Sequence, residues 1–311
     1  MSRRYLSDIA YSVGDARPLD ALRAQEGLST EAVETFRERG LREYRDDARS
    51  VPEMCVGSAL ETLRLAALDP AEVDSILIAS SNSDAIVEDD QETALFAALN
   101  AAGFGRCRVL GLTLQACSAC GDALRVAGGL LELAADARPV LVIIFGQKRV
   151  NRLGPQGNLV FSDGAASCLV SKAGGTFEIC ASESVSNTEL GRMGRNGDLA
   201  QFHGGLIELR EVARKVSGEA GIALGEVRAV LGTNAGLGHL QLMAQAAGIP
   251  IEKIYSDDVS RFAHVHSCDN LISLKHYAER NALADGEPLL LLSWSPHVVS
   301  ASLVRYCASR N

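Results

Sequence analysis

The sequence predicts an α/β protein built from two similar halves. Short continuous runs of β-branched and other apolar residues alternate with longer segments in which apolar residues recur at helical spacing. Runs of the first kind are typical of buried strands in a parallel sheet, and segments of the second kind are typical of helices that cover it. The order of these elements in the first half of the chain recurs in the second half, which favours an internal duplication.

The first half of the chain contains four predicted strands with helical patterns between them. The strands are VDSILIASS (73–81), RVLGLTL (108–114), PVLVIIFG (139–146) and AASCLVS (165–171). The helical patterns are QETALFAALNAAG (91–103) and ACGDALRVAGGLLELAADA (119–137). Because each strand pattern is apolar over most of its length, we expect buried parallel strands with helices on the faces of the sheet.

The second half repeats this rhythm. Its strand patterns are VRAVLGTN (227–234), KIYS (253–256), PLLLLSW (288–294) and VVSASLVRY (298–306), and its helical patterns cover 237–248 and 267–283. Each half therefore reads strand, helix, strand, helix, strand, strand. We place the boundary after residue 172, which predicts an N-terminal half at 1–172 and a C-terminal half at 173–311. The halves share no evident sequence identity, so the predicted duplication rests on the order of the elements.

The composition excludes several classes of function. A net charge of −9 argues against a nucleic-acid binder, which needs a basic face, although a local basic patch for an acidic carrier or a CoA phosphate stays open. No apolar run reaches the ~18 residues of a membrane span. The N-terminal MSRRYLSDIAYSV has no apolar core of a signal peptide. We therefore expect a cytoplasmic protein that binds neither nucleic acid nor membrane.

The cysteines and the charged segments also bear on the class of protein. Eight cysteines are spread along the chain, and several, such as Cys168 and Cys180, lie within apolar strand patterns. We interpret them as small buried hydrophobes in a reducing compartment and not as a disulfide framework. The charge run RERGLREYRDDAR (37–49) is typical of a solvated helix face or loop, with a place at a substrate mouth as the alternative.

The stretch LQACSACGDAL (114–124) carries the first chemical signal, because Cys117 follows a strand pattern and opens a helix pattern. A redox Cys-x-x-Cys pair with Cys120 usually follows the first strand of a smaller unit, and a zinc site needs further ligands at metal spacing. The start of a helix instead favours an anion, which suits a nucleophilic thiolate. We therefore interpret Cys117 as the nucleophile and Cys120 as a small apolar residue that lines an acyl pocket, with no metal site.

Several segments resemble the ketoacyl-ACP synthase III type of the thiolase superfamily. ACSACGDALRVAGGLL (116–131) looks like its nucleophile elbow, and NLVFSDGAASCLVSK (158–172) is similar to its FGDGAGAAVL stretch. LREYRDDARS (41–50) stands in the place of its GIRERR segment, and the terminal SASLVRY resembles its closing strand. The resemblance spans essentially the whole chain. It implies the thiolase fold with five αβαβα layers, a homodimer, acyl-CoA or acyl-carrier-protein thioesters as substrates, and no further cofactor.

The sequence departs from that family at two catalytic positions. Condensing members use the cysteine, a histidine in PHQAN and an asparagine in GN. In LGTNAGLGHL (231–240), Thr233 stands where that histidine belongs and Gly236 stands where the asparagine of PHQAN belongs. In FAHVHSCDN (262–270), His264 stands at the position of the GN asparagine. The two donors that stabilise an enolate oxygen in condensation are therefore not evident here.

The residues present suit acyl transfer. Asp269 follows His264 by five residues, and a histidine oriented by a carboxylate is a better general base. This spacing resembles H-x-x-x-x-D-N in a minor branch of the family, whose members act as acyltransferases or starter-unit loaders in secondary metabolism. We therefore predict a catalytic Cys117, His264 and Asp269. The alternatives are a loop role for His264, a functional His266 in its place, and an Asp269 that only caps a helix.

The resemblance also implies an oxyanion hole and a substrate pocket. The backbone N–H of Cys117 would supply one oxyanion donor, and Ser295 in SWSPHVVS (293–300) would supply the other, since Pro296 has no N–H. Trp294 and His297 add bulk where condensing members have glycines, which predicts an altered pocket.

Further polar residues are assigned around this pocket or to the scaffold. We expect Thr233 and Asn234 to lie near the acyl group as hydrogen-bond donors. His203 is interpreted as structural or pocket-lining, and His239 and His276 as structural.

The favoured function is an acyltransferase that passes an acyl group from a CoA or carrier-protein thioester, through Cys117, to a small hydroxyl, amine or thiol acceptor. Polyketide-type secondary metabolism is the expected setting. A decarboxylating condensing enzyme, a non-catalytic subunit of a heterodimeric synthase and a redox protein are the alternatives, and retention of Cys117 weighs against the non-catalytic subunit.

Overall fold

A computed structural model of the chain describes residues 3–80, 89–133, 138–147, 152–154, 157–192, 199–295 and 297–308. Its centre is a ten-stranded sheet in the order β10-β9-β11-β12-β8-β1-β7-β6-β4-β5. The N-terminal half supplies β1 (Tyr5–Val13), β4 (Ser75–Ser80), β5 (Arg108–Leu112), β6 (Val140–Gly146) and β7 (Gly164–Ser171). The C-terminal half supplies β8 (Phe177–Ser186), β9 (Ala229–Leu231), β10 (Ile254–Tyr255), β11 (Pro288–Trp294) and β12 (Val298–Tyr306).

The two halves of the sheet have the same internal order. Starting from the middle of the sheet, each half places its first strand, then its fifth, fourth, second and third. β1 and β8 meet at the pairs Tyr5–Glu178 and Leu6–Phe177, whereas β8 pairs with β12 over almost its whole length. The sheet is therefore two five-stranded parts joined at a short seam. The predicted boundary after residue 172 falls in the segment between β7 and β8.

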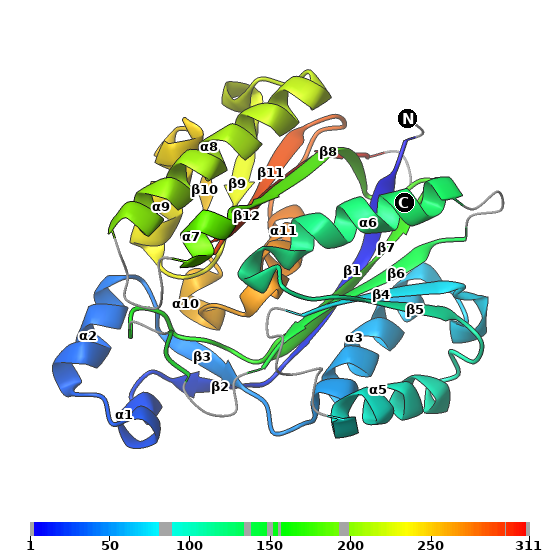
Figure 1. Ribbon diagram of the computed structural model, residues 1–311, viewed down its shortest axis with the longest axis horizontal. Coiled ribbons are helices and arrows are strands. Elements are labelled where there is room, and N and C mark those ends of the chain that lie inside the picture. Colours follow the sequence, from blue (N-terminus) through cyan, green and yellow to red (C-terminus); the bar gives the residue numbers. More distant parts are fainter. Residues whose placement is uncertain are drawn as a thin grey trace.

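Helices complete five layers, as Figure 1 shows. The outer helices of the N-terminal half are α3 (Val51–Ala66) and α5 (Asp89–Ala101), and those of the C-terminal half are α8 (Leu199–Ala220) and α9 (Leu237–Ala247). The middle layer is α6 (Ala119–Leu133) and α11 (Asp269–Arg280), which contact strands of both halves. This is the predicted αβαβα arrangement with two repeated halves, and it confirms the fold class.

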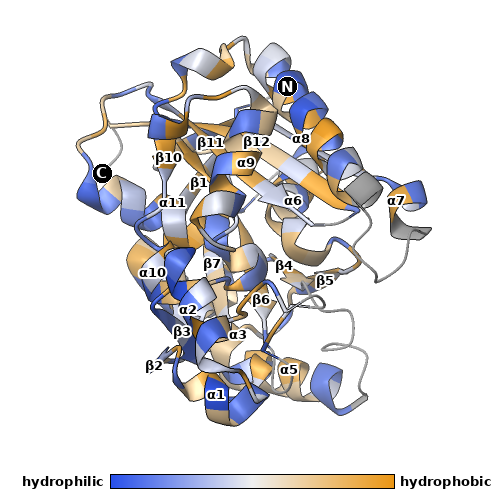
Figure 2. Ribbon diagram, turned by 90° about the vertical axis from the view of Figure 1, so that its left-hand side faces the viewer, coloured by the Kyte–Doolittle hydropathy of each residue, from blue (hydrophilic) through white to orange (hydrophobic). Residues whose placement is uncertain are grey.

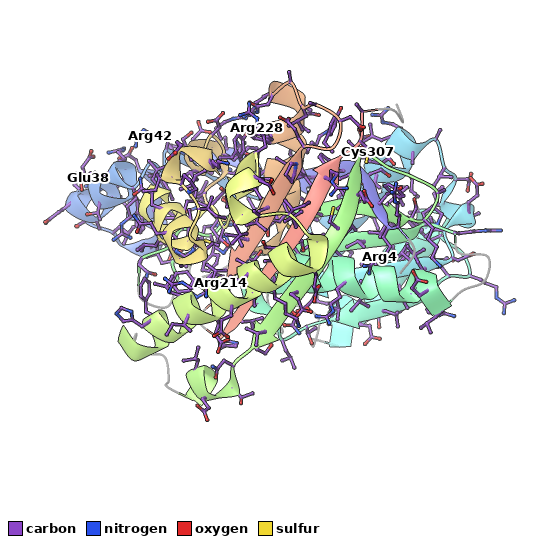
Figure 3. All side chains as sticks on the ribbon, turned by 90° about the horizontal axis from the view of Figure 1, so that it is seen from above. Arg4, Glu38, Arg42, Arg214, Arg228 and Cys307 are labelled. Carbon is purple, nitrogen blue, oxygen red and sulfur yellow. The ribbon has the colours of Figure 1, made fainter. Side chains whose placement is uncertain are left out.

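Each pair of layers encloses its own apolar core. One core lies between α3, α5 and the N-terminal strands, one between α8, α9 and the C-terminal strands, and the largest surrounds α6 and α11. The amphipathic pattern of α8 explains its outer place, because Val212 and Val216 are buried while Arg214 between them is exposed (Figure 3). Hydropathy colouring shows the strands as a largely apolar interior behind helices with polar outer faces (Figure 2).

Short elements surround this framework. They are α1 (Ala21–Glu26), α2 (Thr30–Glu38), β2 (Asp15–Pro18), β3 (Glu43–Asp46), α7 (Thr188–Arg192) and α10 (Val259–Phe262), with 3₁₀ turns at Pro70–Glu72, Ala116–Ser118, Leu224–Glu226, Ile251–Lys253 and His266–Cys268. None of the helices within the described ranges combines the length and the apolar character that crossing a bilayer requires. The eight cysteines are all free thiols. Cys168 is buried as interpreted from the sequence, whereas Cys180 is only half-buried.

The structure corrects the predicted element list. Each half begins with a strand and a helix that the apolar runs did not reveal, namely β1 with α3 and β8 with α8. β8 was not predicted as a strand because its apolar residues alternate with partly exposed ones, so it has no continuous apolar run. The predicted strands at 165–171 and 298–306 are antiparallel to their neighbours, and the sheet is therefore mixed and not all parallel. Residues 81 and 134–137 of the predicted elements lie outside the described residues.

The charge run at 37–49 is not a simple solvated face. Part of it forms β3, which pairs with β2 at the edge of the molecule. Arg45 lies over the ring of Phe262 and donates two hydrogen bonds to the Arg261 carbonyl, 2.7 and 3.0 Å long. The run therefore attaches this edge to α10. Asp163, from the FSDGAAS motif, accepts from the Asp47 N–H and from buried Arg152, so that motif anchors the same edge.

One buried side chain joins the middle layer to the C-terminal strands. Asn270, the second residue of α11, donates to the carbonyls of Leu231 in β9 and Leu292 in β11 at 3.0 and 3.1 Å. Its amide oxygen accepts from the Ser293 hydroxyl. Because the Asn270 amide connects β9 and β11 to the start of α11, Asn270 fixes the position of this helix end.

We therefore expect Asn270→Ala to lower the free energy of unfolding by about 2–4 kcal/mol, since it leaves several buried polar groups without partners. Asn100→Ala, on the exposed face of α5, is the matched control and should change it by less than about 0.5 kcal/mol. Urea unfolding followed by circular dichroism measures both. A loss below about 1 kcal/mol for Asn270→Ala would contradict the anchoring role.

Candidate active site

Cys117 lies on a tight elbow between β5 and α6. The residues before it adopt left-handed backbone conformations, with φ of 70° at Leu114 and 44° at Ala116. Such angles are costly for residues with a Cβ and persist where the surroundings impose them. Two hydroxyls hold the next residue, because Ser118 Oγ donates to the Val298 carbonyl at 2.8 Å and Ser300 Oγ donates to the Ser118 carbonyl at 3.0 Å. The elbow leaves the Cys117 side chain half-buried.

The structure brings the three predicted catalytic side chains together in one chain of contacts. Cys117 Sγ lies 3.1 Å from His264 Nε2, and His264 Nδ1 lies 2.6 Å from Asp269 Oδ2. His264 and Asp269 are almost completely buried. Because the carboxylate accepts at Nδ1, the histidine presents Nε2 to the sulfur. This is the geometry in which a histidine can exchange a proton with a cysteine.

Asp269 is held by two backbone donors as well as by the histidine. Its Oδ1 accepts from the Val265 N–H at 2.8 Å, and its Oδ2 accepts from the Asn234 N–H at 2.7 Å. A buried carboxylate needs such donors to remain charged. Asp269 is the first residue of α11, but the N-cap position belongs to Cys268 and no side-chain capping bond forms there, so the alternative that Asp269 only caps the helix is wrong.

His264 is held through its backbone by the FSDGAAS region. Its N–H donates to the Val160 carbonyl at 3.1 Å, and its carbonyl accepts from the Ser162 N–H at 2.9 Å. The Phe161 ring between these contacts lies 5.2 Å from the His264 ring and stacks on His266 at 4.6 Å. The alternative that His266 takes the place of His264 receives no support, because the ring that meets the sulfur is that of His264.

The electrostatics of the site favour a charged histidine. Burial by itself lowers the pKa of His264, but the negative charges of a Cys117 thiolate and of Asp269, with their hydrogen bonds, outweigh it and raise the pKa to about 10. The ring of His266 also lies close to that of His264, with ring centroids 5.7 Å apart.

A third histidine, His239 on α9, is affected by this charge. Burial, together with the charge of His264, lowers the pKa of His239 to about 3. The neighbouring histidine on α9 therefore stays neutral while His264 carries the charge.

Three predicted pocket residues have structural contacts. Cys120 packs in the central core with residues of both sheet halves, and burial raises its pKa to about 12. It is therefore a small buried core residue, as interpreted from the sequence, and its place beside an acyl pocket stays a prediction. Thr233 is buried, and its hydroxyl accepts from the Trp294 N–H at 3.5 Å. Asn234 supports Asp269 through its backbone, while its buried side-chain Nδ2 has no hydrogen-bond partner within the described residues.

The predicted second oxyanion donor is not supported. The N–H of Ser295 donates to the Val298 carbonyl at 2.9 Å, and its hydroxyl donates to the same oxygen at 2.8 Å. These bonds close the turn between β11 and β12 and leave this N–H engaged. Pro296 lies outside the described residues. His297 is half-buried, and its carbonyl accepts from the Asn187 N–H at 2.9 Å.

Trp294 and the remaining histidines belong largely to the scaffold. Trp294 belongs to the core under α8 and stacks on His239 with ring centroids 4.9 Å apart. His276 on α11 hydrogen-bonds to Asp258 at 2.8 Å and to the Tyr11 hydroxyl at 2.9 Å. His203 is exposed on α8. Within the described residues no group of three His, Cys, Asp or Glu side chains is arranged to hold a metal ion.

Comparison with solved structures identifies the architecture. No model of a protein family and no curated protein matches the sequence. Among solved structures, the chain is similar to the acyltransferase ChlB3, with a TM-score of 0.84 and 20% identity over 98% of each chain. The chain has the thiolase fold.

Two further structures place this thiolase-fold chain beside ketoacyl-ACP synthase III-type enzymes. The 3-oxoacyl-[acyl-carrier-protein] synthase III of Aquifex aeolicus matches with a TM-score of 0.78 and 20% identity over 97% of this chain and 100% of its own. The priming β-ketosynthase of a polyketide biosynthetic pathway matches with a TM-score of 0.77 and 19% identity over 98% of this chain and 97% of its own. The structural resemblance inferred from the sequence motifs is therefore confirmed.

Sequence reasoning missed two residues that position the site. The hydroxyl of Ser267 contacts both sides of the Cys117 elbow, and the ring of Phe161 covers His264. Phe161 lies in the FSDGAAS motif, so its place in that motif was an available signal. Ser267 lies between His264 and Asp269, but no local pattern indicates that its partners, Ala119 and Ala116, lie 148 and 151 residues before it in the chain.

We expect the alkylation rate of Cys117 by iodoacetamide to stay nearly constant from about pH 6 to about pH 9. His264 has a raised pKa, so its positive charge is present throughout this window and is lost only as the pH rises through about 10. In His264→Ala, which lacks this charge, the rate should instead rise steeply with pH over the same window, as for an isolated thiol. Intact-mass analysis and peptide mapping follow the reaction.

Cys120→Ala is the matched control and should keep the wild-type profile, because that thiol is buried in the core. A wild-type rate that rises steeply through about pH 8, as for a free thiol, would contradict the ion pair.

Proposed function

We propose that this chain is an acyltransferase that works through an acyl-enzyme on Cys117. The observation that carries the proposal is the continuous contact from Cys117 Sγ through His264 to Asp269. A histidine at this position can accept a proton, whereas the amide of the asparagine expected of a condensing enzyme forms hydrogen bonds but does not take up a proton. The similarity to a solved acyltransferase of the same fold supports this choice.

The first half-reaction loads the enzyme. The Cys117 thiolate attacks the carbonyl carbon of an acyl-CoA or acyl-carrier-protein thioester, forming a new carbon–sulfur bond as the bond to the carrier sulfur breaks. The departing carrier thiolate takes the proton of the His264 imidazolium. The backbone N–H of Cys117, at the start of the helical segment, is the oxyanion donor that we retain from the sequence prediction.

The second half-reaction transfers the acyl group. Neutral His264 accepts the proton of a hydroxyl, amine or thiol acceptor as that atom attacks the Cys117 thioester, and the Cys117 thiolate leaves. Asp269 stabilises the imidazolium that forms and keeps the ring in one tautomer. The thiolate and imidazolium are regenerated, so no redox cofactor or metal takes part in the proposed cycle.

The setting and assembly are part of the same proposal. The similarity to a polyketide priming ketosynthase supports a role in polyketide-type secondary metabolism, in the cytoplasm.

We also propose that two copies associate. β5 forms an edge of the sheet, and Leu114, two residues beyond it, is 76% exposed. A large apolar side chain exposed beside an edge strand is typical of a surface that a partner covers.

We expect His264→Ala to slow acyl transfer by about 10²–10⁴-fold and Asp269→Asn to slow it somewhat less, because general-base help of this kind has that size. Purified variants are loaded from a panel of acyl-CoA thioesters and then given hydroxyl, amine or thiol acceptors, and the formation and loss of the acyl-enzyme are followed by intact mass. Cys117→Ala should form no adduct, while His203→Ala, on the exposed face of α8, should behave as wild type. Acylation that survives Cys117→Ala would overturn the assignment of the nucleophile.

Acyl transfer and condensation are separated by a carbon-dioxide assay. The wild-type enzyme, loaded with an acyl group and given a malonyl thioester, should release no stoichiometric carbon dioxide, because the donor pair for an enolate oxygen is missing at Thr233 and His264. A ketoacyl product formed together with carbon dioxide, and still formed by His264→Ala, would show that the chain is a condensing enzyme.

Static light scattering at micromolar protein should give twice the 33.0 kDa mass of one chain. Leu114→Lys should weaken this association, since it places a charge on the exposed apolar position, and the exposed Leu133→Lys on α6 is the control. A wild-type monomer at these concentrations would rule out the homodimer.

A further inference from the structure

A single buried hydroxyl bridges the two segments that carry the catalytic side chains. Ser267 lies between His264 and Asp269 in sequence and is 1% exposed. Its Oγ donates to the Ala116 carbonyl at 2.9 Å and accepts from the Ala119 N–H at 3.2 Å. These partners lie one residue before and two residues after Cys117, so the hydroxyl brackets the nucleophile.

Both partners are backbone groups that need this contact. Ala116 has a left-handed φ of 44°, a conformation that costs roughly 1–2 kcal/mol for a residue with a Cβ. Ala119 is the first residue of α6, where the backbone N–H groups have no partner within the helix. Ser267 therefore acts as a cap for α6 from a distant segment and holds the strained elbow in the same contact.

The segment that carries Ser267 is itself held in place. His266 and Ala263 have φ values of 53° and 49°, so the chain bends sharply on both sides of His264. The His266 ring packs directly against Gly146 at the end of β6, so closely that a Cβ at Gly146 would overlap the ring. This contact holds the segment against β6. The position of Ser267 is therefore fixed by the packing of the residues before it.

The other hydroxyls at the elbow hold it in a different direction. The hydrogen bonds of the Ser118 and Ser300 hydroxyls join the elbow to the first residues of β12. Ser267 joins the elbow to the segment on which His264 and Asp269 lie. The hydrogen bonds of Ser267 thus run beside the 3.1 Å contact between Cys117 Sγ and His264 Nε2.

We propose that Ser267 is a positioning residue that sets the distance and direction of the Cys117 sulfur relative to His264. The consequence for turnover rests on the proposed function, whereas the geometric claim rests on the contacts alone. Without the hydroxyl, the Ala116 carbonyl and the Ala119 N–H lose their partner, and the elbow is free to relax its left-handed residue. A displacement of about 1 Å at a reacting group can cost about 10²-fold in rate.

The test compares Ser267→Ala with Ser273→Ala. Ser273 is a buried serine on α11 whose hydroxyl has no hydrogen-bond partner within the described residues, so its removal matches the chemistry of the change without breaking a contact. The measurement is the rate of iodoacetamide alkylation of Cys117 against pH, which reports the sulfur–imidazole pair without any acyl substrate. Thermal unfolding of each variant is measured in parallel.

We expect Ser267→Ala to slow alkylation about tenfold or more near pH 6.5 and to give a profile that rises with pH like an ordinary thiol. Ser273→Ala should keep the wild-type profile, and Ser267→Thr, which retains the hydroxyl, should recover most of the rate. A Ser267→Ala enzyme with a lower melting temperature but an unchanged pH profile would overturn the inference, because Ser267 would then be only structural.

Ser267→Cys provides the second variant where the alanine variant does not fold, because it keeps the size of the side chain and weakens both hydrogen bonds. Peptide mapping separates its new thiol from Cys117, and a wild-type profile there overturns the inference as well. The proposed function is tested apart from this. A wild-type enzyme that reacts with iodoacetamide but takes no acyl group from any thioester refutes the acyltransferase and leaves the positioning role standing.

Discussion

The candidate site depends on one buried carboxylate. Asp269 accepts hydrogen bonds from the His264 ring, from the Val265 N–H and from the Asn234 N–H. A buried charge of this kind is tolerated only when such donors surround it, so the segments that provide them must pack around the carboxylate where it is buried. The loop after β9, the bend after α10 and the start of α11 are therefore assembled around a single residue, and Asn270 beside it attaches the same helix end to β9 and β11.

The duplication explains how two distant segments meet. α6 follows the third strand of the N-terminal half, and α11 follows the third strand of the C-terminal half, so the two middle helices occupy equivalent places. Cys117 lies just before α6, and His264 and Asp269 lie at the start of α11. Both helix N-termini thus lie at the site, where their partial positive charges favour a thiolate and an oxyanion. Each half of the fold contributes one part of the chemistry.

The proposed acyl transfer differs from condensation because of the residues that stand at two positions. Thr233 is buried, and its hydroxyl contacts the backbone of Trp294 at the end of β11. His264 contacts the sulfur directly and has a pKa raised by the charges on either side of it, against the effect of burial. A charged histidine beside a thiolate can give and take back a proton within one cycle, which transfer to a hydroxyl, amine or thiol requires.

The sequence by itself determined the order of most elements, the thiolase fold through its motifs, and the pairing of His264 with Asp269. These features are local, since periodicity, an elbow motif and a spacing of five residues are all visible within short windows. It could not give the antiparallel β7 and β12, the engaged N–H of Ser295 or the bridging hydroxyl of Ser267. Only the tertiary structure decided these, because strand direction, burial and hydrogen-bond partners depend on which segments, often more than a hundred residues apart, pack against each other.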